Sequence, residues 1–424
     1  MQQLKLNYVT VGTVRRKRGV KMNHTHTSKI NNDSMIKKWK RNIPLDYIDT
    51  FIGNLNMQSC VWVLYLAFRG MNLAQIGILE GIYHAVSIVC EVPSGAMADL
   101  LGRKKCMLIS RVLIAVSCVI MLFGNNFWWF ALSFGIQALG NNMNSGSEEA
   151  LIYDSMKAVG NEDAYMGVYG RLNVIIEVSQ QIATVVGGIL AEASFAYCYG
   201  ASLVIGCLAI VPVIFMEEVP TNQKLEVSVP QLIRQHFKTS FDILKEDRRI
   251  LQIIAFYAVV FTGHTLLFFY SQQYFTDLGY NKIQLSLIML AVGLVSCAGA
   301  LLSEKLYEKL GKKMAYLGAF GIAFAFLCYG ADNLWISMVS FGVASFCNSM
   351  LYPVQSDSLN ELIPSEQRAT LISINSMFFS IGMIVLFPLA GALADVFGLT
   401  RILVAIGVLL ATLVVIFCLR KQAI

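Results

Sequence analysis

Acidic and amide side chains recur at helical spacing inside otherwise apolar stretches of this chain. In the stretch 168–192 they fall at i, i+4, i+7, i+8 and i+11, at Asn173, Glu177, Gln180, Gln181 and Thr184. That spacing puts them on one face of a helix. Glu177 has no Lys or Arg within one turn of its own helix, so its carboxyl group can take up and release a proton in apolar surroundings. We predict Glu177 as a proton carrier, alone or together with Glu149; the alternative is a permanent pairing of Glu177 across a helix interface.

Three other apolar stretches carry polar residues with similar spacing. These are Asp46, Thr50, Asn54 and Gln58 in 43–68, Asn141, Ser145, Glu148 and Glu149 in 127–156, and Asn348, Tyr352 and Gln355 in 333–360. Ionisable groups are costly to bury in an apolar segment, so each is a functional candidate. His84 and His264 could take part in proton transfer, although ordinary hydrogen bonding is the simpler interpretation.

The composition indicates which solvent surrounds these stretches. The chain has 424 residues, of which 56% are hydrophobic and 14% charged, against about 45–50% and about 25% in soluble proteins. A membrane-spanning helix needs about 20 apolar residues. The chain is therefore predicted to be an all-α integral membrane protein with twelve transmembrane helices. The predicted spans are 43–68, 75–98, 106–124, 127–156, 168–192, 195–216, 250–275, 282–304, 313–331, 333–360, 369–393 and 398–419.

The distribution of Lys and Arg gives the predicted orientation. With the N-terminus in the cytoplasm, 30 of the 33 basic residues lie inside, and only Arg69, Lys282 and Arg401 lie outside, as the positive-inside rule requires. We therefore predict a multi-pass protein of the inner (plasma) membrane with both termini cytoplasmic. Residues 1–42 are predicted to form a basic cytoplasmic tail, whose run at 15–18 could touch anionic lipid. The net charge of +6 does not indicate nucleic-acid binding, because the basic residues lie in short stretches between apolar segments.

An internal repeat divides the chain. An acid, two residues, a glycine and two bases occupy 99–104 and again 308–313, an offset of 209 residues. Two further pairs of segments match at an offset of 203 residues, namely 153–156 with 356–359 and 187–192 with 390–395. The chain is therefore predicted to contain two six-helix bundles, 43–216 and 250–424, related by a parallel pseudo-two-fold repeat. Apolar residues at helical spacing in the linker 217–249 predict an amphipathic helix on the inner membrane face.

The segment Gly95-x-x-x-Asp99-x-x-Gly102-Arg103-Lys104-Lys105 resembles the signature loop between helices 2 and 3 of the major facilitator superfamily. The degenerate second copy falls where that family places it, and the segments 91–95 and 149–154 are similar to a bacterial, drug-efflux-like branch. Gly95 is expected to let its helix approach a neighbour closely, and Gly102 to allow a tight turn. The charged residues would form a latch that holds the two bundles in one conformation and breaks in the other. The predicted latch residues are Gly95, Asp99, Gly102, Arg103, Lys104, Asp154, Glu308 and Asp357.

The resemblance also implies which helices surround the substrate. In the family, helices 1, 4, 7 and 10 lie innermost with helices 2, 5, 8 and 11 beside them, and the polar stripes fall on those spans. The residues expected to line a substrate cavity are Asn54, Gln58, Asn141, Asn173, Gln181, His264, Asn348 and Tyr352. One departure concerns the fifth span, which keeps Gly187 and Gly188 but lacks the proline that proton antiporters of the family carry there.

The predicted function is secondary active transport by alternating access, as proton-coupled efflux of small amphipathic organic compounds. The alternative is proton-coupled or facilitated uptake of a small nutrient such as a sugar or an organic ion, which the amide-rich stripes and the missing proline favour. The expected partners are the small-molecule substrate, protons and membrane lipid, with a monomer as the functional unit.

Enzymatic activity is not indicated. The sequence contains no HExxH motif, and Glu148-Glu149 lacks the following arginine of a glutamate-type intramembrane protease. It also contains no GxxxxGK(S/T) loop, which argues against ATP-driven transport by this chain alone. The ten cysteines include no CxxC pair, so neither a metal site nor a disulfide framework is expected. No catalytic residue and no cofactor are predicted.

Overall fold

The chain forms helices joined by short connections. The computed structural model describes residues 26–220, 229–246, 248–360, 362 and 368–419. The α-helices are α1 (His26–Gly53), α2 (Trp62–Phe68), α3 (Leu73–Leu101), α4 (Arg103–Phe123), α5 (Phe127–Ala158), α6 (Tyr165–Ala193), α7 (Phe195–Phe215), α8 (Val229–Glu246), α9 (Arg248–Asp277), α10 (Lys282–Leu310), α11 (Lys313–Cys328), α12 (Leu334–Asn360), α13 (Arg368–Phe397) and α14 (Leu399–Leu419). Two 3-10 helices are η1 (Glu162–Ala164) and η2 (Tyr329–Ala331). Residues 1–25 of the predicted basic tail and residues 221–228 of the predicted linker lie outside the described residues.

Within the described part of the chain, ten helices are long and apolar enough to cross a membrane. They are α3, α4, α6, α7, α9, α10, α11, α12, α13 and α14, with η1 and η2 extending α6 and α11. The protein is therefore an all-helical membrane protein, as its composition predicts. Two predicted spans miss this criterion: the first, which contains part of α1 and all of α2, and the fourth, which is α5. Both carry charged and amide residues, so their polar groups must be satisfied by protein rather than by lipid.

The predicted first span is interrupted, and this boundary was missed. A stretch of turns separates α1 from α2. The Asn54 side chain donates to the Thr50 carbonyl oxygen at 2.8 Å, and such side-chain bonds to the backbone compete with continuation of a helix. The start of α2 is fastened to the second half of the chain, because Gln272 Oε1 accepts a hydrogen bond from the Val63 N–H at 3.2 Å.

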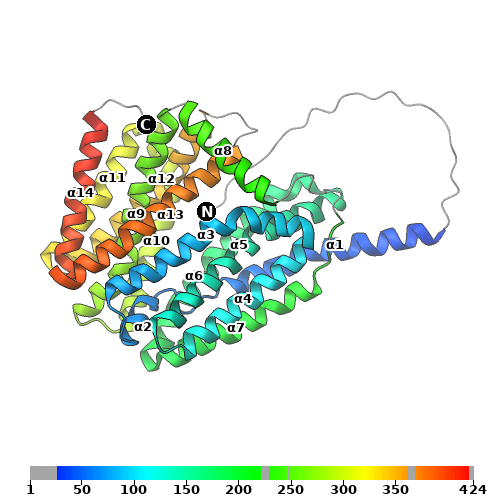
Figure 1. Cartoon of the computed structure of the whole chain (residues 1–424), viewed down its shortest axis with the longest axis horizontal. Helices are drawn as coiled ribbons and strands as arrows, with labels where there is room; N and C mark the ends of the chain where they lie inside the picture. The colour runs from blue at the N-terminus through cyan, green and yellow to red at the C-terminus, as the bar shows by residue number, and fades with distance from the viewer. Residues whose placement is uncertain (1–25, 221–228, 247, 361, 363–367, 420–424) are drawn as a thin grey trace.

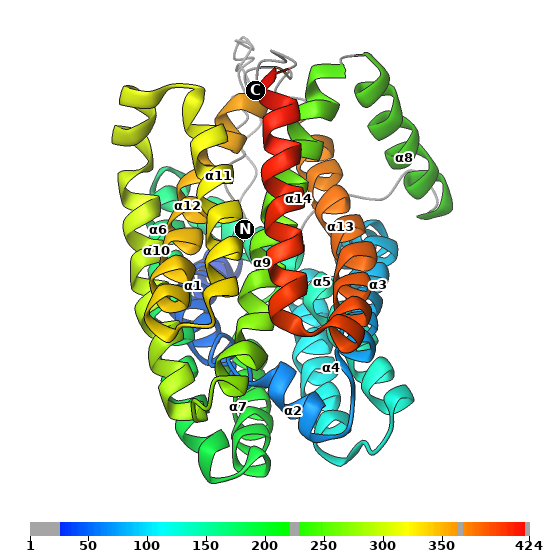
Figure 2. The same cartoon turned by 90° about the vertical axis from the view of Figure 1, so that its left-hand side faces the viewer.

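The long helices form two groups. Helices α1–α7 pack against one another and helices α9–α14 do the same, while α3 packs on α13 and α6 packs on α10 across the two groups. Helix α8 contacts both α3 and α13. Figure 1 shows that the groups meet near α2 and diverge from there, the first running toward the right and the second toward the top. In Figure 2, α2 lies toward the lower end of the molecule and α8 toward the upper end. We call these ends the α2 end and the α8 end.

Carboxylates from each group cap a helix of the other group at the α2 end. Glu192, at the end of α6, accepts a hydrogen bond from the N–H of Lys282, the first residue of α10, at 2.8 Å. Asp395, near the end of α13, accepts from the N–H groups of Leu73 at 3.0 Å and Ala74 at 2.9 Å, at the start of α3. A carboxylate at a helix N-terminus satisfies free N–H groups and interacts favourably with the helix dipole. We call these two contacts the crossed caps.

The residues of the two crossed caps are separated by the same offsets as the internal sequence repeat. Leu73 and Lys282 are 209 positions apart, and the two capping carboxylates are 203 apart. Glycines follow the same rule, because a Cβ on Gly188 would lie 2.8 Å from the Lys282 carbonyl oxygen and one on Gly391 would meet the Leu73 carbonyl oxygen. The capping boxes that begin α3 and α10 are also equivalent, and consist of Asn72 with Gln75 and Asn281 with Gln284. The two groups of helices therefore meet through equivalent contacts on each side.

Candidate functional site

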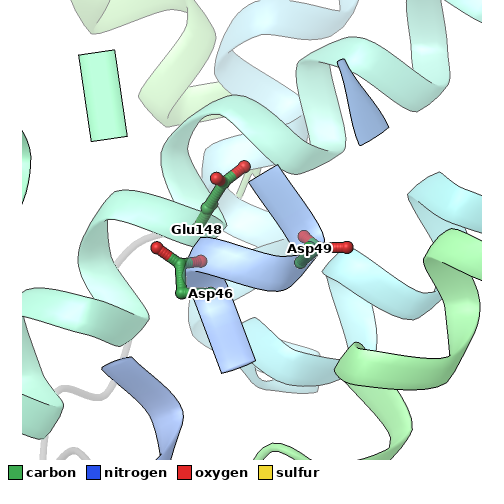
Figure 3. A group of neighbouring side chains, drawn as sticks. All are labelled: Asp46, Asp49 and Glu148. Carbon is green, nitrogen blue, oxygen red and sulfur yellow. The ribbon is translucent and has the colours of Figure 1, made fainter. Parts of the chain in front are cut away.

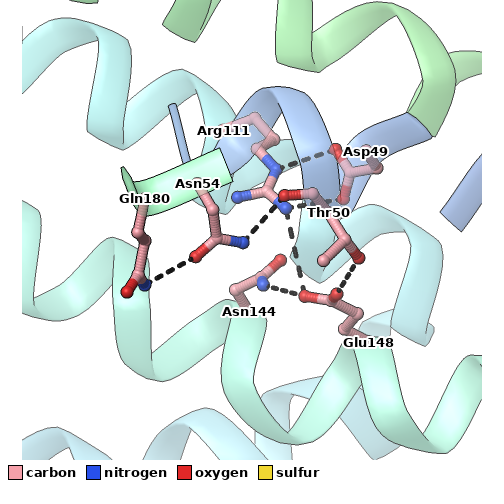
Figure 4. Close-up of polar contacts among 7 residues, drawn as sticks. All are labelled: Asp49, Thr50, Asn54, Arg111, Asn144, Glu148 and Gln180. Atoms are coloured by element: carbon pink, nitrogen blue, oxygen red, sulfur yellow. Dashed lines mark hydrogen bonds and ion pairs between the residues drawn. The ribbon is translucent and has the colours of Figure 1, made fainter. Parts of the chain in front are cut away.

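A buried arginine binds a buried aspartate in the first group of helices. Arg111 of α4 is 7% exposed, and Asp49 of α1 is fully buried. The guanidinium contacts both carboxylate oxygens, with Nε 3.1 Å from Oδ1 and Nη2 2.5 Å from Oδ2 (Figure 4). A Cβ on Gly53 would lie 3.0–3.1 Å from the guanidinium, so the glycine in α1 leaves room for the arginine. A bidentate pair of this kind is among the strongest that the two groups can form.

Glu148 of α5 extends this contact into a network (Figure 4). Its Oε2 lies 3.9 Å from the arginine Nη2 and accepts a hydrogen bond from the Asn144 side chain. Its Oε1 accepts from Thr50 Oγ1 at 3.1 Å. Asn54, which donates to the Thr50 carbonyl oxygen, also accepts from Gln180 of α6 at 3.4 Å. The network thus joins the polar stripes of the first, fourth and fifth predicted spans.

Asp46 lies beside this network without a hydrogen bond to any described residue. It is fully buried, and neither of its carboxylate oxygens has a partner there. Asp46, Asp49 and Glu148 each place a carboxylate oxygen within 4.8 Å of the others (Figure 3). The arginine that serves these carboxylates lies well inside its helix. Arg111 is eight positions after the start of α4, which is about 12 Å along the helix at 1.5 Å per residue. We call Asp46, Asp49, Arg111 and Glu148 the acidic cluster.

Two members of the acidic cluster are missing from the predicted sites. Asp49 was not singled out, although it follows Asp46 by three positions and therefore shares its helix face. Arg111 is not among the predicted site residues either, although it lies inside the predicted third span, 106–124. An arginine inside a membrane span requires a buried acid, and that rule could have indicated a partner such as Asp49.

An ion pair and hydrogen bonds hold the predicted signature loop within the first group of helices. Gly102 has a φ of 98°, the left-handed region that favours glycine. Arg103 forms an ion pair with Asp154 at the end of α5. Glu218, which follows α7, caps the start of α4 by accepting from the N–H groups of Arg103 at 3.0 Å and Lys104 at 2.9 Å. Four of the predicted latch residues therefore contribute to one cluster, and Glu218 is a partner that the sequence pattern did not reveal.

The other predicted latch residues lie apart at the α8 end. Asp99, Glu308 and Asp357 are exposed, and none of them makes an ion pair or hydrogen bond within the described ranges. Gly95 is also exposed, and a Cβ there would have nothing within 4 Å, so the close helix approach expected of it is absent from this conformation. The predicted latch between the two bundles is thus not formed at the end where the two groups diverge.

The two predicted proton carriers have different surroundings. Glu177 is exposed on α6, within electrostatic range of Cys297 on α10. Glu149 is half-buried on α5 and hydrogen-bonded to Tyr169 on α6. Neither carboxylate forms an ion pair with a Lys or Arg side chain in the part of the chain that the structure covers.

The predicted cavity residues of the first half do not form one contact group. Asn54 belongs to the network described above, and Asn141 donates to a tyrosine hydroxyl of α3 at 2.9 Å. Gln58 and Gln181 each hold a buried side-chain oxygen without a partner among the described residues. Asn173 is exposed on α6.

The predicted cavity residues of the second half lie on facing helices. His264 Nε2 of α9 is 3.0 Å from Ser345 Oγ of α12. Tyr352 is hydrogen-bonded to Asn348, and its ring stacks on Phe261 with centroids 4.2 Å apart. His264 therefore has an ordinary hydrogen-bond partner, in keeping with the simpler interpretation of its role.

Polar contacts also join the two groups along α3 and α13. His84 Nδ1 is 3.1 Å from Ser380 Oγ, and its Nε2 is 3.5 Å from the carboxylate of Glu80 one turn earlier. Nearer the α8 end, Glu91 accepts a hydrogen bond from Ser373 at 2.6 Å. The groups therefore stay in contact along this pair of helices well beyond the crossed caps.

Charged groups buried among apolar helices, and two groups of helices with equivalent contacts, define a polytopic membrane transporter. The chain belongs to the Major Facilitator Superfamily, whose sequence profile it matches over residues 50–331 and 276–423. Proteins of this family are transporters, so the chain is a transport protein and not an enzyme.

Sequence relatives align with most of the chain at low identity. The chain is 25% identical over 390 residues to the quinolone resistance protein NorA of Staphylococcus aureus (strain MRSA252), covering 89% of the chain and 95% of NorA. It is 23% identical over 373 residues to YxaM, an uncharacterized MFS-type transporter of Bacillus subtilis (strain 168), covering 85% of the chain and 90% of YxaM.

Solved transporters share the fold. The nucleoside transporter NupG matches with a TM-score of 0.73 at 12% identity, covering 90% of the chain and 98% of NupG. A D-xylose-proton symporter matches with a TM-score of 0.63 at 16% identity, covering 91% of the chain and 97% of the symporter. At such identities the likeness concerns the fold alone.

Proposed function

We propose that this chain is a secondary active transporter that works by alternating access and expels small amphipathic organic compounds in exchange for protons. The ten apolar helices, α5, and α1 with α2 as one interrupted span would make twelve spans. They would form two six-helix bundles, 43–216 and 250–424, joined by the linker 217–249. Both chain ends and α8 would face the cytoplasm, with the protein in the plasma membrane. The α2 end would then be the outer end, held closed by the crossed caps.

The observation that carries this proposal is the set of titratable side chains among the membrane helices of a transporter-family chain. Carboxylates held away from water change their preferred partners when they bind a proton. A proton that binds one conformation better than the other shifts the balance between the two. The similarity to NorA, whose name states quinolone resistance, favours efflux of drug-like organic compounds.

Uptake of a nutrient is the second candidate function. The fold is shared with proteins described as a nucleoside transporter and a D-xylose-proton symporter. Amides such as Asn54 and Gln180, which bond to each other at 3.4 Å, present the donors and acceptors that hydroxylated compounds require.

Transport by vesicles of both orientations tests the function. Inside-out vesicles containing the protein are expected to accumulate amphipathic compounds, quinolones among them, when their interior is acidified. Vesicles without the protein serve as the control. Accumulation of a sugar or nucleoside by right-side-out vesicles with acid outside would favour uptake instead. The absence of any dependence on the proton gradient in either orientation would reject proton coupling.

Glu177→Gln is expected to abolish pH-driven transport while preserving substrate binding. The amide mimics the protonated carboxyl group, and binding should lose its pH dependence. Transport by inside-out vesicles and binding at several pH values measure the two effects, with Glu149→Gln examined in parallel. Wild-type pH dependence in Glu177→Gln would assign the proton to another group.

Asp99→Asn is expected to reduce transport while the protein stays inserted in the membrane. Asp99 is exposed in this conformation, so the charged partner that we propose for it would form only when the α8 end closes. Transport rate and membrane abundance are the measurements. Asp163→Asn, an exposed carboxylate on η1, is the matched control. Normal turnover in Asp99→Asn would reduce the signature loop to a determinant of topology.

A further inference from the structure

Three carboxylates of the acidic cluster share one guanidinium. If all were ionised, Asp46, Asp49 and Glu148 together with Arg111 would carry a net charge of about −2 in the protein interior, where uncompensated charge costs several kcal/mol per ion. The acidic cluster therefore requires additional positive charge to balance its three carboxylates.

The three carboxylates differ in how well they are compensated. Asp49 holds the guanidinium with both oxygens. Glu148 accepts hydrogen bonds from Thr50 and Asn144 and lies 3.9 Å from Arg111. Asp46 is fully buried, and no described residue donates a hydrogen bond to either of its oxygens. Asp46 is therefore the carboxylate on which a negative charge is least compensated.

Among the charged groups that act most strongly on Asp46, Arg111 is the positive one. Asp46 interacts electrostatically with Glu148 of α5, Asp49 of its own helix and Arg111 of α4. Tyr165 of α6 is its further titratable neighbour, and α7, which packs on α1, contains no Asp, Glu, Lys or Arg. Glu148 and Asp49 both disfavour a negative charge on Asp46, and Arg111 is already engaged by Asp49.

We infer that Asp46 binds a proton in this conformation, which makes the acidic cluster a second proton site beside Glu177 and Glu149. A metal ion fits the geometry less well. Hard cations take six or more oxygen ligands at about 2.1–2.6 Å, whereas Arg111 occupies both oxygens of Asp49 and would repel a second cation. A proton neutralises a carboxylate without any coordination shell.

The proton site connects to conformational change through the guanidinium. Arg111 lies 2.5 Å from Asp49 and 3.9 Å from Glu148 through the same Nη2 atom. A proton leaving Asp46 adds a negative charge beside both, and changes how the arginine is shared between α1 and α5. This inference rests on the proposed proton-coupled function, because it assigns that function a further proton-binding group.

Infrared spectroscopy of the purified full-length protein tests the inference without any transport measurement. A protonated carboxyl group gives a carbonyl band that ionised carboxylates lack. The wild type is expected to show this band at neutral pH, and Asp46→Asn to lose it. Glu177→Gln and the exposed control Asp163→Asn are expected to keep it. An unchanged band in Asp46→Asn overturns the inference, as does a wild-type protein that lacks the band in sodium chloride and in choline chloride alike.

Thermal unfolding of Asp46→Asn and Asp49→Asn provides a second, matched readout. Asparagine resembles protonated aspartic acid, so Asp46→Asn is expected to melt as the wild type does. Asp49→Asn removes the anion that Arg111 needs, and is expected to melt at a lower temperature. If Asp46→Asn fails to fold or loses as much stability as Asp49→Asn, Asp46 is an ionised structural group and the inference fails. Both readouts can succeed while the vesicle assay shows no proton coupling, so failure of the site and failure of the function are distinguishable.

Discussion

Gly391→Val is expected to reduce transport severalfold or more by holding the two groups of helices apart at the α2 end. A side chain at this position of α13 would meet the carbonyl group of Leu73 in α3, and a backbone group cannot rotate away. Overpacking of this kind costs about 1–3 kcal/mol, and a free energy of that size changes the ratio of two conformations by roughly 5–150-fold. The conformation with a closed α2 end should therefore lose population.

The distance between spin labels on Asn125→Cys and Asn333→Cys, in a background without native cysteines, measures this shift. Both positions are exposed in connections at the α2 end, one in each group of helices. The distance is expected to lengthen in Gly391→Val. Gly167→Val is the matched control, because a Cβ there would have nothing within 4 Å. An unchanged distance together with normal transport would show that the close approach at Gly391 is dispensable.

Arg111→Gln is expected to destabilise the protein by about 3–5 kcal/mol, the usual cost of removing one partner of a buried ion pair. The substitution leaves Asp49, which is fully buried, without its bidentate partner. It also removes the guanidinium that lies 3.9 Å from Glu148. The expected observation is a large drop in the temperature at which the detergent-solubilised protein loses its monodisperse elution profile.

The double variant Arg111→Gln with Asp49→Asn tests whether the stability lost in Arg111→Gln comes from leaving Asp49 as an unpaired buried charge. Because it removes both charges of the pair, it should recover much of the stability that either single variant loses, as coupled neighbours do in a double-mutant cycle. Additive losses in the double variant would show that the two side chains contribute independently, and the pair would then not be the reason why α1 and α4 stay together.

Much of the fold could be predicted because lipid imposes a simple rule on the sequence. Helices such as α10 and α14 carry long apolar runs between polar breaks, and length with hydropathy suffices to find them. The interruption between α1 and α2 was missed because it depends on contacts that hydropathy does not contain. One of these contacts joins Val63 to Gln272, which lies 209 positions later.

The candidate site was harder to predict because it depends on how helices pack. The polar stripes on single helices include Thr50, Asn54 and Gln180, which the structure joins in one network. Helical spacing cannot say which stripes meet, so the pairing of Asp49 with Arg111, 62 positions apart, stayed hidden. Glu177 was favoured because it lacks a local base, whereas the complete burial of Asp46 depends on helix packing that spacing along one helix does not contain.

The polarity of α5 also bears on how the chain enters the membrane during synthesis. An acid or base at the centre of an inserting helix costs about 2.5–3.5 kcal/mol on insertion scales, and α5 does not meet the apolar criterion that ten other helices meet. Its neighbour α4 carries Arg111, which faces Glu148 in the folded protein. Entry of α4 and α5 together as a helical hairpin would neutralise part of this charge before either helix meets lipid alone. Because α1 is synthesised first, Asp49 is already available to receive Arg111, so the translocon is expected to retain α1 until the hairpin arrives.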